Sequence, residues 1–251
     1  MVIIIFFILH WYLSLFCQSF FQHRYAAHGA FTMSRGWQKV FYVFTYFMQG
    51  SSYLSTRAYA VMHRMHHAFA DTKEDPHSPK FFSSVFTMMW GTKNTYLHIV
   101  ANPDEAEAKF RKNVPDWPVF DAIGESRWSR VAWIAVYVVI YYFFATHWWL
   151  WLLLPIQIVM GPFHGAIINW FAHKYGYRNF RVNNTSTNLL PVDVLMLGES
   201  YHNNHHKFPS SINFGFKWWE LDPLYPVTLL LGKLGVIKLN PGGVKRTATE
   251  F

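Results

Sequence analysis

The feature that most restricts the fold is a set of three long segments without charge. Residues 2–21 (VIIIFFILHWYLSLFCQSFF) are long enough to cross the roughly 30 Å hydrocarbon core of a bilayer as one helix. Residues 131–154 and 155–171 follow one another without an intervening Lys or Arg, which predicts a helical hairpin with its turn at 146–157, facing outward. Charged residues make up only 14% of the chain, where soluble domains have about a quarter. The sequence therefore predicts an all-α integral membrane protein with about three transmembrane helices.

The alternative for residues 2–21 is a cleaved signal peptide. Such a peptide begins with basic residues and ends at a small-residue cleavage site. This chain has no basic residue before the apolar run, and the nearest small-residue site, at 26–30, lies beyond it. We therefore expect the segment to be kept as a membrane span.

The basic residues predict which side of the membrane each region faces. All 22 Lys and Arg residues lie within 24–130 or 174–246, and the positive-inside rule places such regions in the cytoplasm. We therefore expect one domain, 1–251, with cytoplasmic regions 23–130 and 172–251. The net charge of +8 fits binding to anionic headgroups, and no nucleic-acid-binding motif accompanies it.

One apolar stretch, residues 37–48, does not fit a simple crossing. Basic residues flank it on both sides, with Arg24 and Arg35 before it and Arg57 and Arg64 after it. A spanning helix would place these two groups in different compartments. We therefore predict a helix in the plane of the membrane or a shallow re-entrant helix.

Histidines occur in three short boxes. The pattern His-x-x-His-His occurs twice, as HRMHH and HNNHH, and HRYAAH follows the first apolar segment. On a helix, positions i, i+3 and i+4 share one face, so each triplet can direct its rings to one place. The boxes hold eight of the 14 histidines: His23, His28, His63, His66, His67, His202, His205 and His206.

Eight imidazoles are too many for one ion and enough for two. Imidazole binds Zn, Cu, Fe and Ni, and the single Cys17 excludes a thiolate cluster. Iron, unlike zinc, changes oxidation state, so we expect a non-haem centre of two Fe ions. The helical hairpin returns the chain to the same side, so all three boxes meet in a cytoplasmic helical cap if 37–48 does not span.

The boxes resemble those of the membrane-bound fatty acyl desaturases, the acyl-CoA desaturase family. HRYAAH, HRMHHAFADTKEDPHSP and GESYHNNHHKFP resemble the three histidine boxes of that family, in the same order. INWFAHKYGYRNF resembles its Asn-x-x-x-His and Gly-Tyr-Arg sequence. This likeness implies that His173 is a ninth ligand and that Asn169 reaches one metal through water. It also implies O2-dependent desaturation of a fatty acyl chain, which the acyl-CoA enzymes perform at the Δ9 position.

Three residues beside the boxes are expected to orient ligand rings. Asp75 and His77 follow the second box, and Glu199 precedes the third. A ligating histidine usually donates its other ring N–H to a carboxylate or a carbonyl. The sequence KWWE at 217–220 is expected to anchor the cap on the membrane surface.

The substrate and the electron donor are expected to be separate molecules. The sequence QGSSYLSTRAYAV before the second box differs from the animal pattern, so the carrier of the acyl chain, coenzyme A or a membrane lipid, stays open. The PGG sequence near the end of the chain follows Asn240 where a haem motif has His, which indicates a turn and no fused cytochrome b5. Electrons are then expected from a ferredoxin or a protein of the cytochrome b5 type.

Two other functions fit parts of the pattern. The same metal shell in a hydroxylase would add oxygen to the chain, and sequence alone does not separate this outcome from desaturation. A membrane metal or haem carrier would place its histidines within the spanning helices. Here the boxes lie at helix exits and in cytoplasmic segments, which favours the enzyme.

Overall fold

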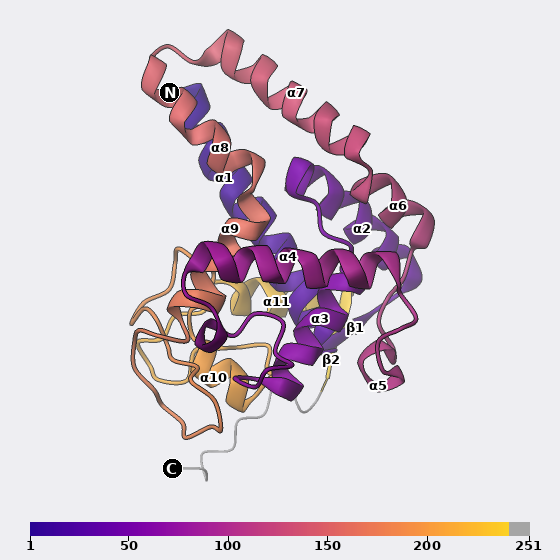
Figure 1. Cartoon of the computed structure of the whole chain (residues 1–251), viewed down its shortest axis with the longest axis vertical. Coiled ribbons are helices and arrows are strands. Elements are labelled where there is room, and N and C mark those ends of the chain that lie inside the picture. Colours follow the sequence, from indigo (N-terminus) through magenta and orange to yellow (C-terminus); the bar gives the residue numbers. More distant parts are fainter. Residues whose placement is uncertain (241–251) are drawn as a thin grey trace.

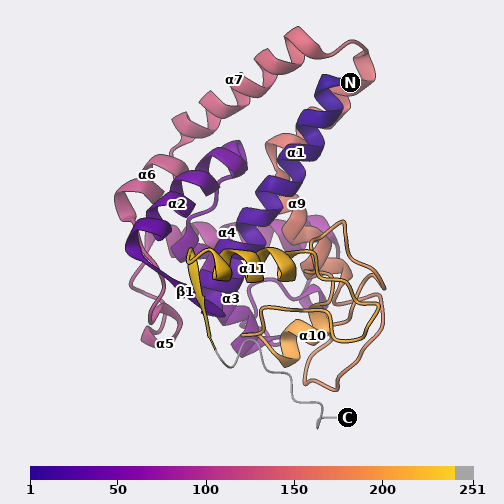
Figure 2. The ribbon, with the colours of Figure 1, turned by 180° about the vertical axis from the view of Figure 1, so that it is seen from behind.

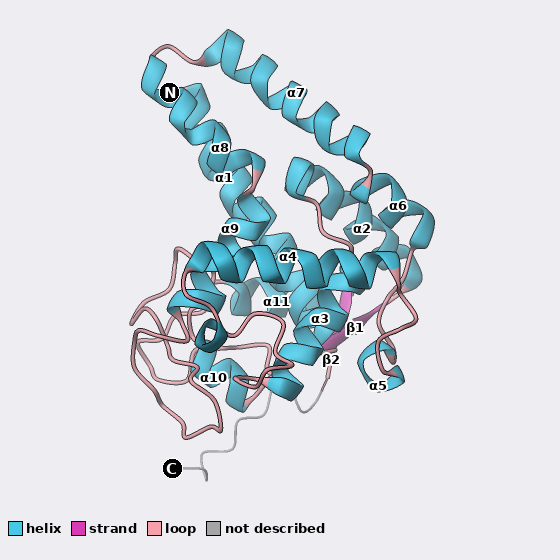
Figure 3. Ribbon diagram, viewed as in Figure 1, coloured by secondary structure: helices cyan, strands magenta, loops and turns pink. Residues whose placement is uncertain are grey.

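The computed structural model describes residues 1–240 and shows a mostly helical molecule with one small sheet (Figures 1 and 3). Residues 241–251, which include the end of the predicted region 172–251 and the PGG sequence, lie outside the described part. Helices α1, α7, α8 and α9 extend from one half of the molecule, and α3, α10 and α11 lie in the other half (Figure 1). The prediction of an all-α fold is confirmed at this level.

The first apolar segment forms a single long helix. Helix α1 (Val2–Phe16) continues without a break into a π-helical segment, η1 (Cys17–Ala27). The combined helix Val2–Ala27 has 26 residues and, alone among the described helices, is by itself long and apolar enough to cross a membrane. One face of it packs Trp11 and Leu15 against Met160 and Ile168 of the returning arm.

The predicted hairpin is present, and the chain turns at 145–147, at the start of the predicted turn 146–157. Helix α7 (Arg127–Phe144) ends ten residues before the end of the predicted span 131–154, whose membrane crossing stays a prediction. The returning arm begins with a 3₁₀ segment, η4 (Trp148–Leu153), and continues as α8 (Leu154–Ile158). The turn consists of Ala145, Thr146 and His147, and the apolar residues of the returning arm follow it directly.

The returning arm is bent. After α8 it continues as α9 (Met160–Ala166) and a second π-helical segment, η5 (Ile167–Phe171). Trp148–Ile158 and Met160–Phe171 meet at 74°, and together they are long and apolar enough to form one broken span or a re-entrant loop. By this test one or two segments could cross a membrane, so three crossings stay a prediction.

The ambiguous stretch 37–48 is helical. Helix α2 (Arg35–Gln49) begins at Ser34, whose hydroxyl accepts a hydrogen bond from the Trp37 N–H, and ends at Gly50. Gly50 has φ +53°, and a Cβ there would lie 1.8 Å from the Tyr137 hydroxyl oxygen, so glycine lets α2 stop against α7. Val40 and Phe47 are each about half exposed, so α2 presents an apolar face to its surroundings.

A layer of shorter helices follows. The 3₁₀ segment η2 (Gly50–Ser52) leads into α3 (Thr56–Phe69), which Ser55 caps by accepting a hydrogen bond from the Ala58 N–H. The 3₁₀ segment η3 (Pro79–Phe81) precedes α4 (Val85–Ala101), which crosses the molecule where the long helices enter the other half (Figure 1).

The remaining elements close the second half of the molecule. Two short helices, α5 (Ala108–Arg111) and α6 (Pro118–Glu125), lead to α7. After a long irregular stretch come α10 (His202–Lys207) and α11 (Leu224–Lys233), and α11 crosses the face opposite α4 (Figure 2).

A two-stranded sheet joins the segment after the first long helix to the end of the described chain. Strand β1 (Phe31–Met33) pairs antiparallel with β2 (Ile237–Leu239), so that Phe31 lies opposite Leu239. Phe31 and Ile237 are buried together with Phe20 and Phe41 in one aromatic core. This core fixes the end of η1, where the first histidine box begins.

Candidate metal centre

The first box depends on the π-helical form of η1. A π-helix bonds each N–H to the carbonyl five residues earlier, and single turns of this kind occur often at functional sites. The His28 N–H donates to the His23 carbonyl at 3.1 Å, which is such a bond across the whole box. The wider turn brings the two rings to one side, with centroids 4.9 Å apart. A spacing of five residues would diverge on an ordinary α-helix.

The second and third boxes each divide their histidines between two clusters. In α3, His63 and His67 are four residues apart and point together, and His66 points to the other cluster. In α10 the paired residues are His202 and His206, and His205 points away from them to the cluster of His63 and His67. Two positions four apart lie one above the other on a helix, and this explains the repeated division.

All nine predicted histidines meet in these two clusters. Within each cluster the possible ligand atoms lie within 4.8 Å of one another. The five-histidine cluster consists of His23, His28, His63, His67 and His205, and the four-histidine cluster consists of His66, His173, His202 and His206. The structure thus brings together residues separated by more than 180 positions.

The distances within the clusters suit nitrogen ligands of a common ion. In the five-histidine cluster the Nε2 atoms of His23 and His205 are 3.0 Å apart, and those of His67 and His205 are 2.9 Å apart. In the four-histidine cluster the Nε2 atoms of His173 and His202 are 2.9 Å apart. Two nitrogens at right angles around an ion, each roughly 2.0–2.1 Å away, are separated by about 3 Å.

The protonation of the rings also calls for a cation. His66 Nδ1 lies 2.9 Å from Asp75 Oδ1, and His23 Nδ1 lies 2.7 Å from Glu199 Oε2. A carboxylate only accepts, so each Nδ1 carries the proton and each Nε2 is left with a lone pair. The Nε2 atom of His66 faces that of His206 at 3.2 Å. A metal ion between such lone pairs would turn repulsion into coordination.

Burial keeps the rings in the form that binds metal. Burial first, and then the neighbouring imidazoles, lower the pKa of His63, His67 and His205 well below the usual value. The same two causes lower the pKa of His202 and His206. Neutral imidazole is the ligand form, so this environment favours metal over protons.

The predicted orienting residues differ in their positions. Asp75 and Glu199 each contact a cluster ring, as described above. His77 is buried, and its ring centroid lies 4.3 Å from that of His66, but it belongs to neither of the two clusters. Asn169 lies in η5 and lines the cavity described below.

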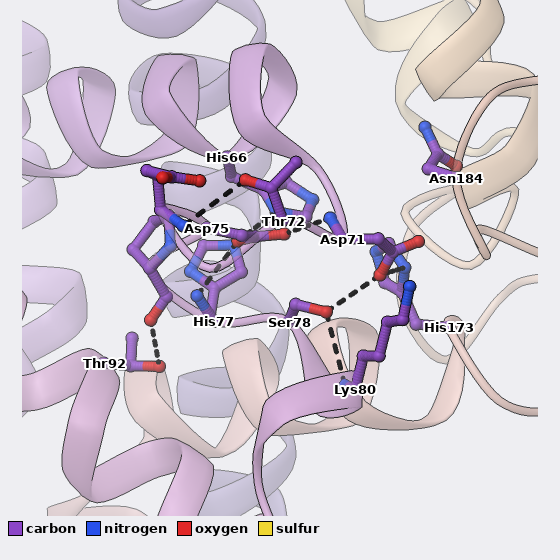
Figure 4. Close-up of polar contacts among 12 residues, drawn as sticks. His66, Asp71, Thr72, Asp75, His77, Ser78, Lys80, Thr92, His173 and Asn184 are labelled. Atoms are coloured by element: carbon purple, nitrogen blue, oxygen red, sulfur yellow. Dashed lines mark hydrogen bonds and ion pairs between the residues drawn. The ribbon is translucent and has the colours of Figure 1, made fainter.

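Several contacting residues were missed by sequence reasoning. His173 Nδ1 lies 4.0 Å from Asp71 Oδ1, and Figure 4 shows the two residues side by side. The same nitrogen lies 3.1 Å from the Thr185 hydroxyl, and His206 Nδ1 lies 3.2 Å from the Asn184 amide. Asp71 also accepts a hydrogen bond from the Thr185 N–H, which ties the loop after α3 to the loop before α10. The EDPH sequence drew attention to Asp75, and no spacing pattern marked Asp71 or Thr185.

Glu220, expected in a membrane anchor, supports the third box. Trp218 is 92% exposed, but Glu220 is buried. The Glu220 carboxylate accepts hydrogen bonds from Asn204, Asn179 and the Tyr177 hydroxyl. Asn204 stands between two histidines of α10, so this network holds the helix from its side away from the clusters.

A cavity of about 640 Å³ adjoins both clusters. His23, His63 and His202 line it, together with Asn169 and Glu199. Most of the remaining wall is apolar or aromatic and comes from α1, α4 and the bent arm of α9. An apolar cavity that ends at a cluster of metal ligands can present an unreactive hydrocarbon to a metal centre.

Comparisons with known proteins agree with this geometry. The family model for fatty acid desaturases matches residues 1–232. An sn-1 stearoyl-lipid 9-desaturase of Anabaena variabilis is 30% identical over 192 residues, covering 69% of this chain and 61% of that protein. Delta-9 acyl-lipid desaturase 1 of Arabidopsis thaliana is 28% identical over 222 residues, covering 85% of this chain and 67% of that protein.

An acyl-CoA 5-desaturase of Anemone leveillei is 29% identical over 221 residues, covering 85% of this chain and 64% of that protein. The three relatives differ in the named acyl carrier and in the named position of the double bond. The chain spans 61–67% of their lengths.

Proposed function

Because the chain belongs to the fatty acid desaturase family, we propose that it is an O2-dependent oxidoreductase that introduces a double bond into a fatty acyl chain. The observation that carries this proposal is that members of both histidine clusters line one largely apolar cavity. The reaction consumes one O2, two electrons and two protons, removes two hydrogens from neighbouring methylenes and releases two waters.

The nine histidines would hold two metal ions, and iron is the metal we propose. Neutral imidazole suits iron, and zinc lacks redox chemistry. Asn169 and His202 both line the cavity, which supports the proposed contact of Asn169 to one metal through a water. Iron bound there would supply the activation of O2 that removal of hydrogen from an unactivated methylene requires.

The protein's own residues would position the ligands and the substrate. Asp75 fixes the tautomer and orientation of His66 by accepting its Nδ1–H, and Glu199 orients His23 from 2.7 Å. The apolar walls would exclude water and hold one pair of methylenes beside the clusters, and this orientation sets the position of the double bond. Two relatives are named 9-desaturases, which supports Δ9 as the position tested first.

We further propose an integral membrane protein with its histidine boxes on the cytoplasmic side. The long apolar helix Val2–Ala27 and the bent arm support membrane insertion, and the distribution of Lys and Arg supports the sidedness. Electrons would come from a separate ferredoxin or a cytochrome b5-type protein.

Analysis of the lipids of an expressing host tests the function. Gas chromatography should show a new monounsaturated fatty acid with the wild-type chain and none with His66→Ala. A new hydroxy acid without a new monoene would show a hydroxylase. A Soret band in the purified protein, with no change in the lipids, would show a haem carrier.

A further inference from the structure

The mouth of the cavity lies between α4 and the bend of the returning arm. On α4, Phe86 is 83% exposed and Trp90 is 63% exposed, although both line the cavity. On the other side Val159, at the break between α8 and α9, is 47% exposed and lines the cavity as well. The residues that are both exposed and cavity-lining therefore mark an opening at the edge of the apolar arm.

Helix α4 is built as one side of this opening. Phe86, Trp90 and Leu97 lie on one stripe of the helix, which is exposed, and Met88 and Ile99 on another side are buried. The helix runs across the molecule where the long apolar helices leave the other half (Figure 1). Large apolar side chains exposed in this position suit a membrane interface, where aromatic residues concentrate.

The charges at the mouth distinguish the two possible acyl carriers. Among the described residues that line the cavity, the Lys, Arg, Asp and Glu side chains apart from Glu199 are Lys93, Glu125 and Arg130. Arg130 is paired with Glu125 at 2.7 Å, which leaves Lys93 as the cation at the mouth. Coenzyme A carries several phosphate charges and calls for a cluster of basic groups. A phospholipid has one phosphate at the depth of an interfacial lysine.

Lys93 has the position that a lipid phosphate would require. It is exposed, and its Nζ lies 4.3 Å from the centre of the Trp90 ring. A lysine at an interface rests its stem on apolar groups and directs its charge to the headgroups.

We propose that the acyl chain enters the cavity sideways from the membrane, between α4 and the α8–α9 bend, as part of an intact glycerolipid. This inference rests on the proposed desaturase function and names its substrate class. The carrier expected from the acyl-CoA likeness is then replaced by a phospholipid, with Trp90 and Phe86 contacting the acyl chain at the mouth and Lys93 contacting the phosphate.

The test uses the iron-loaded full chain in phosphatidylcholine vesicles with an electron donor. One sample contains deuterated stearoyl chains in phosphatidylcholine, and the other contains unlabelled vesicles with deuterated stearoyl-CoA. We expect deuterated monoene within intact phosphatidylcholine. Trp90→Glu should lower its rate by about tenfold or more, roughly 1.4 kcal/mol. Val119→Glu is the matched control, because Val119 is 72% exposed on α6 and does not line the cavity, and it should change the rate by less than about twofold.

Monoene formed only from stearoyl-CoA, or equal losses in the two variants, would overturn the lipid mouth while leaving the desaturase function intact. Monoene in neither sample would contradict the desaturase function itself. If neither sample forms monoene, the lipid mouth can still be tested by a binding measurement that needs no turnover. A photocrosslinking benzoylphenylalanine in place of Phe86 should capture phosphatidylcholine in the vesicles, and the same group at the exposed Lys112 of the cap should not. Equal capture at both positions would overturn the proposal.

Discussion

The two histidine clusters are built in different ways. Four of the five residues in the five-histidine cluster belong to two helices. His23 and His28 lie in and at the end of η1, and His63 and His67 lie one helical turn apart on α3. The four-histidine cluster takes three residues from α3 and α10 and His173 from the turn after η5. Its rings contact the loop residues Asp75, Thr185 and Asn184. The two clusters therefore differ in how many of their rings are held by loop residues, so they should respond to different substitutions.

The largest effect should follow loss of a ligand, and its consequence should differ between the clusters. His202→Ala leaves three histidines in its cluster, and His205→Ala leaves four in the other. Both should lower desaturation by about 100-fold or more, since each disturbs a catalytic metal. His205→Ala should retain more iron after dialysis, because four ligands still suffice to hold an ion.

Iron content by mass spectrometry and the rate of monoene formation measure these two effects. His98→Ala is the control, since His98 is exposed and pairs with Glu105 at 2.8 Å away from the clusters. Equal iron loss in both ligand variants would show that the clusters are not independently held.

The next largest effect should follow loss of the buried ion pair beside the five-histidine cluster. Arg24, adjacent to His23, contacts Asp222 at 2.9 Å, and both side chains are fully buried. Its guanidinium lies 4.0 Å above the ring of Phe214, which packs on His205. Arg24→Met leaves Asp222 as an unpaired buried charge and should lower the free energy of unfolding by about 3–5 kcal/mol.

Denaturant unfolding in detergent measures this loss. The matched control is Arg57→Met, which removes a partly exposed pair with Asp116 and should cost about 1 kcal/mol or less. The same loss in both variants would argue against a special role for the buried pair.

Removal of a single orienting carboxylate should have an intermediate effect. Glu199 is the carboxylate that contacts a ring of the five-histidine cluster in the described part of the chain, and the four-histidine cluster has both Asp75 and Asp71. Glu199→Gln and Asp75→Asn should each lower iron affinity by about 10–100-fold. The loss should be larger for Glu199→Gln, as measured by competition with a chelator. A larger loss for Asp75→Asn would reverse the comparison.

The smallest effect should come from the loop amide. Asn184→Ala removes the contact to His206 Nδ1 and should cost about 0.5–1.5 kcal/mol, a twofold to tenfold loss in iron affinity. Asn102→Ala, on an exposed side chain that contacts the surface residue His98, serves as the control. No difference between the two variants would mean that the loop does not orient the ring.

The same contrast explains what the sequence could predict. The nine histidines, Asp75 and Glu199 were identified from spacing and resemblance, and the structure brings all of them to the two clusters or into contact with them. Their role as metal ligands stays a prediction. Asp71 and Thr185 were missed because their contact joins loops more than a hundred residues apart, and such pairing leaves no periodic pattern.

The remaining differences between the predictions and the structure also arise where local sequence carries no signal. The predicted span 131–154 runs past the end of α7 because the apolar residues of η4 follow the turn directly, and the π-helical form of η1 has no hydropathy signal. Glu220 was assigned to an anchor because its neighbours Trp218 and Trp219 are interfacial residue types, while its own contacts come from distant asparagines.

Mössbauer spectroscopy of protein loaded with enriched iron tests the central claim most directly. The structure predicts about two non-haem ions per chain in two unequal nitrogen-rich environments, which should give two distinct doublets of equal area. His202→Ala should remove one doublet and leave the other. A single doublet in the wild-type protein, one ion per chain or a haem spectrum would contradict a centre built from one five-histidine and one four-histidine cluster.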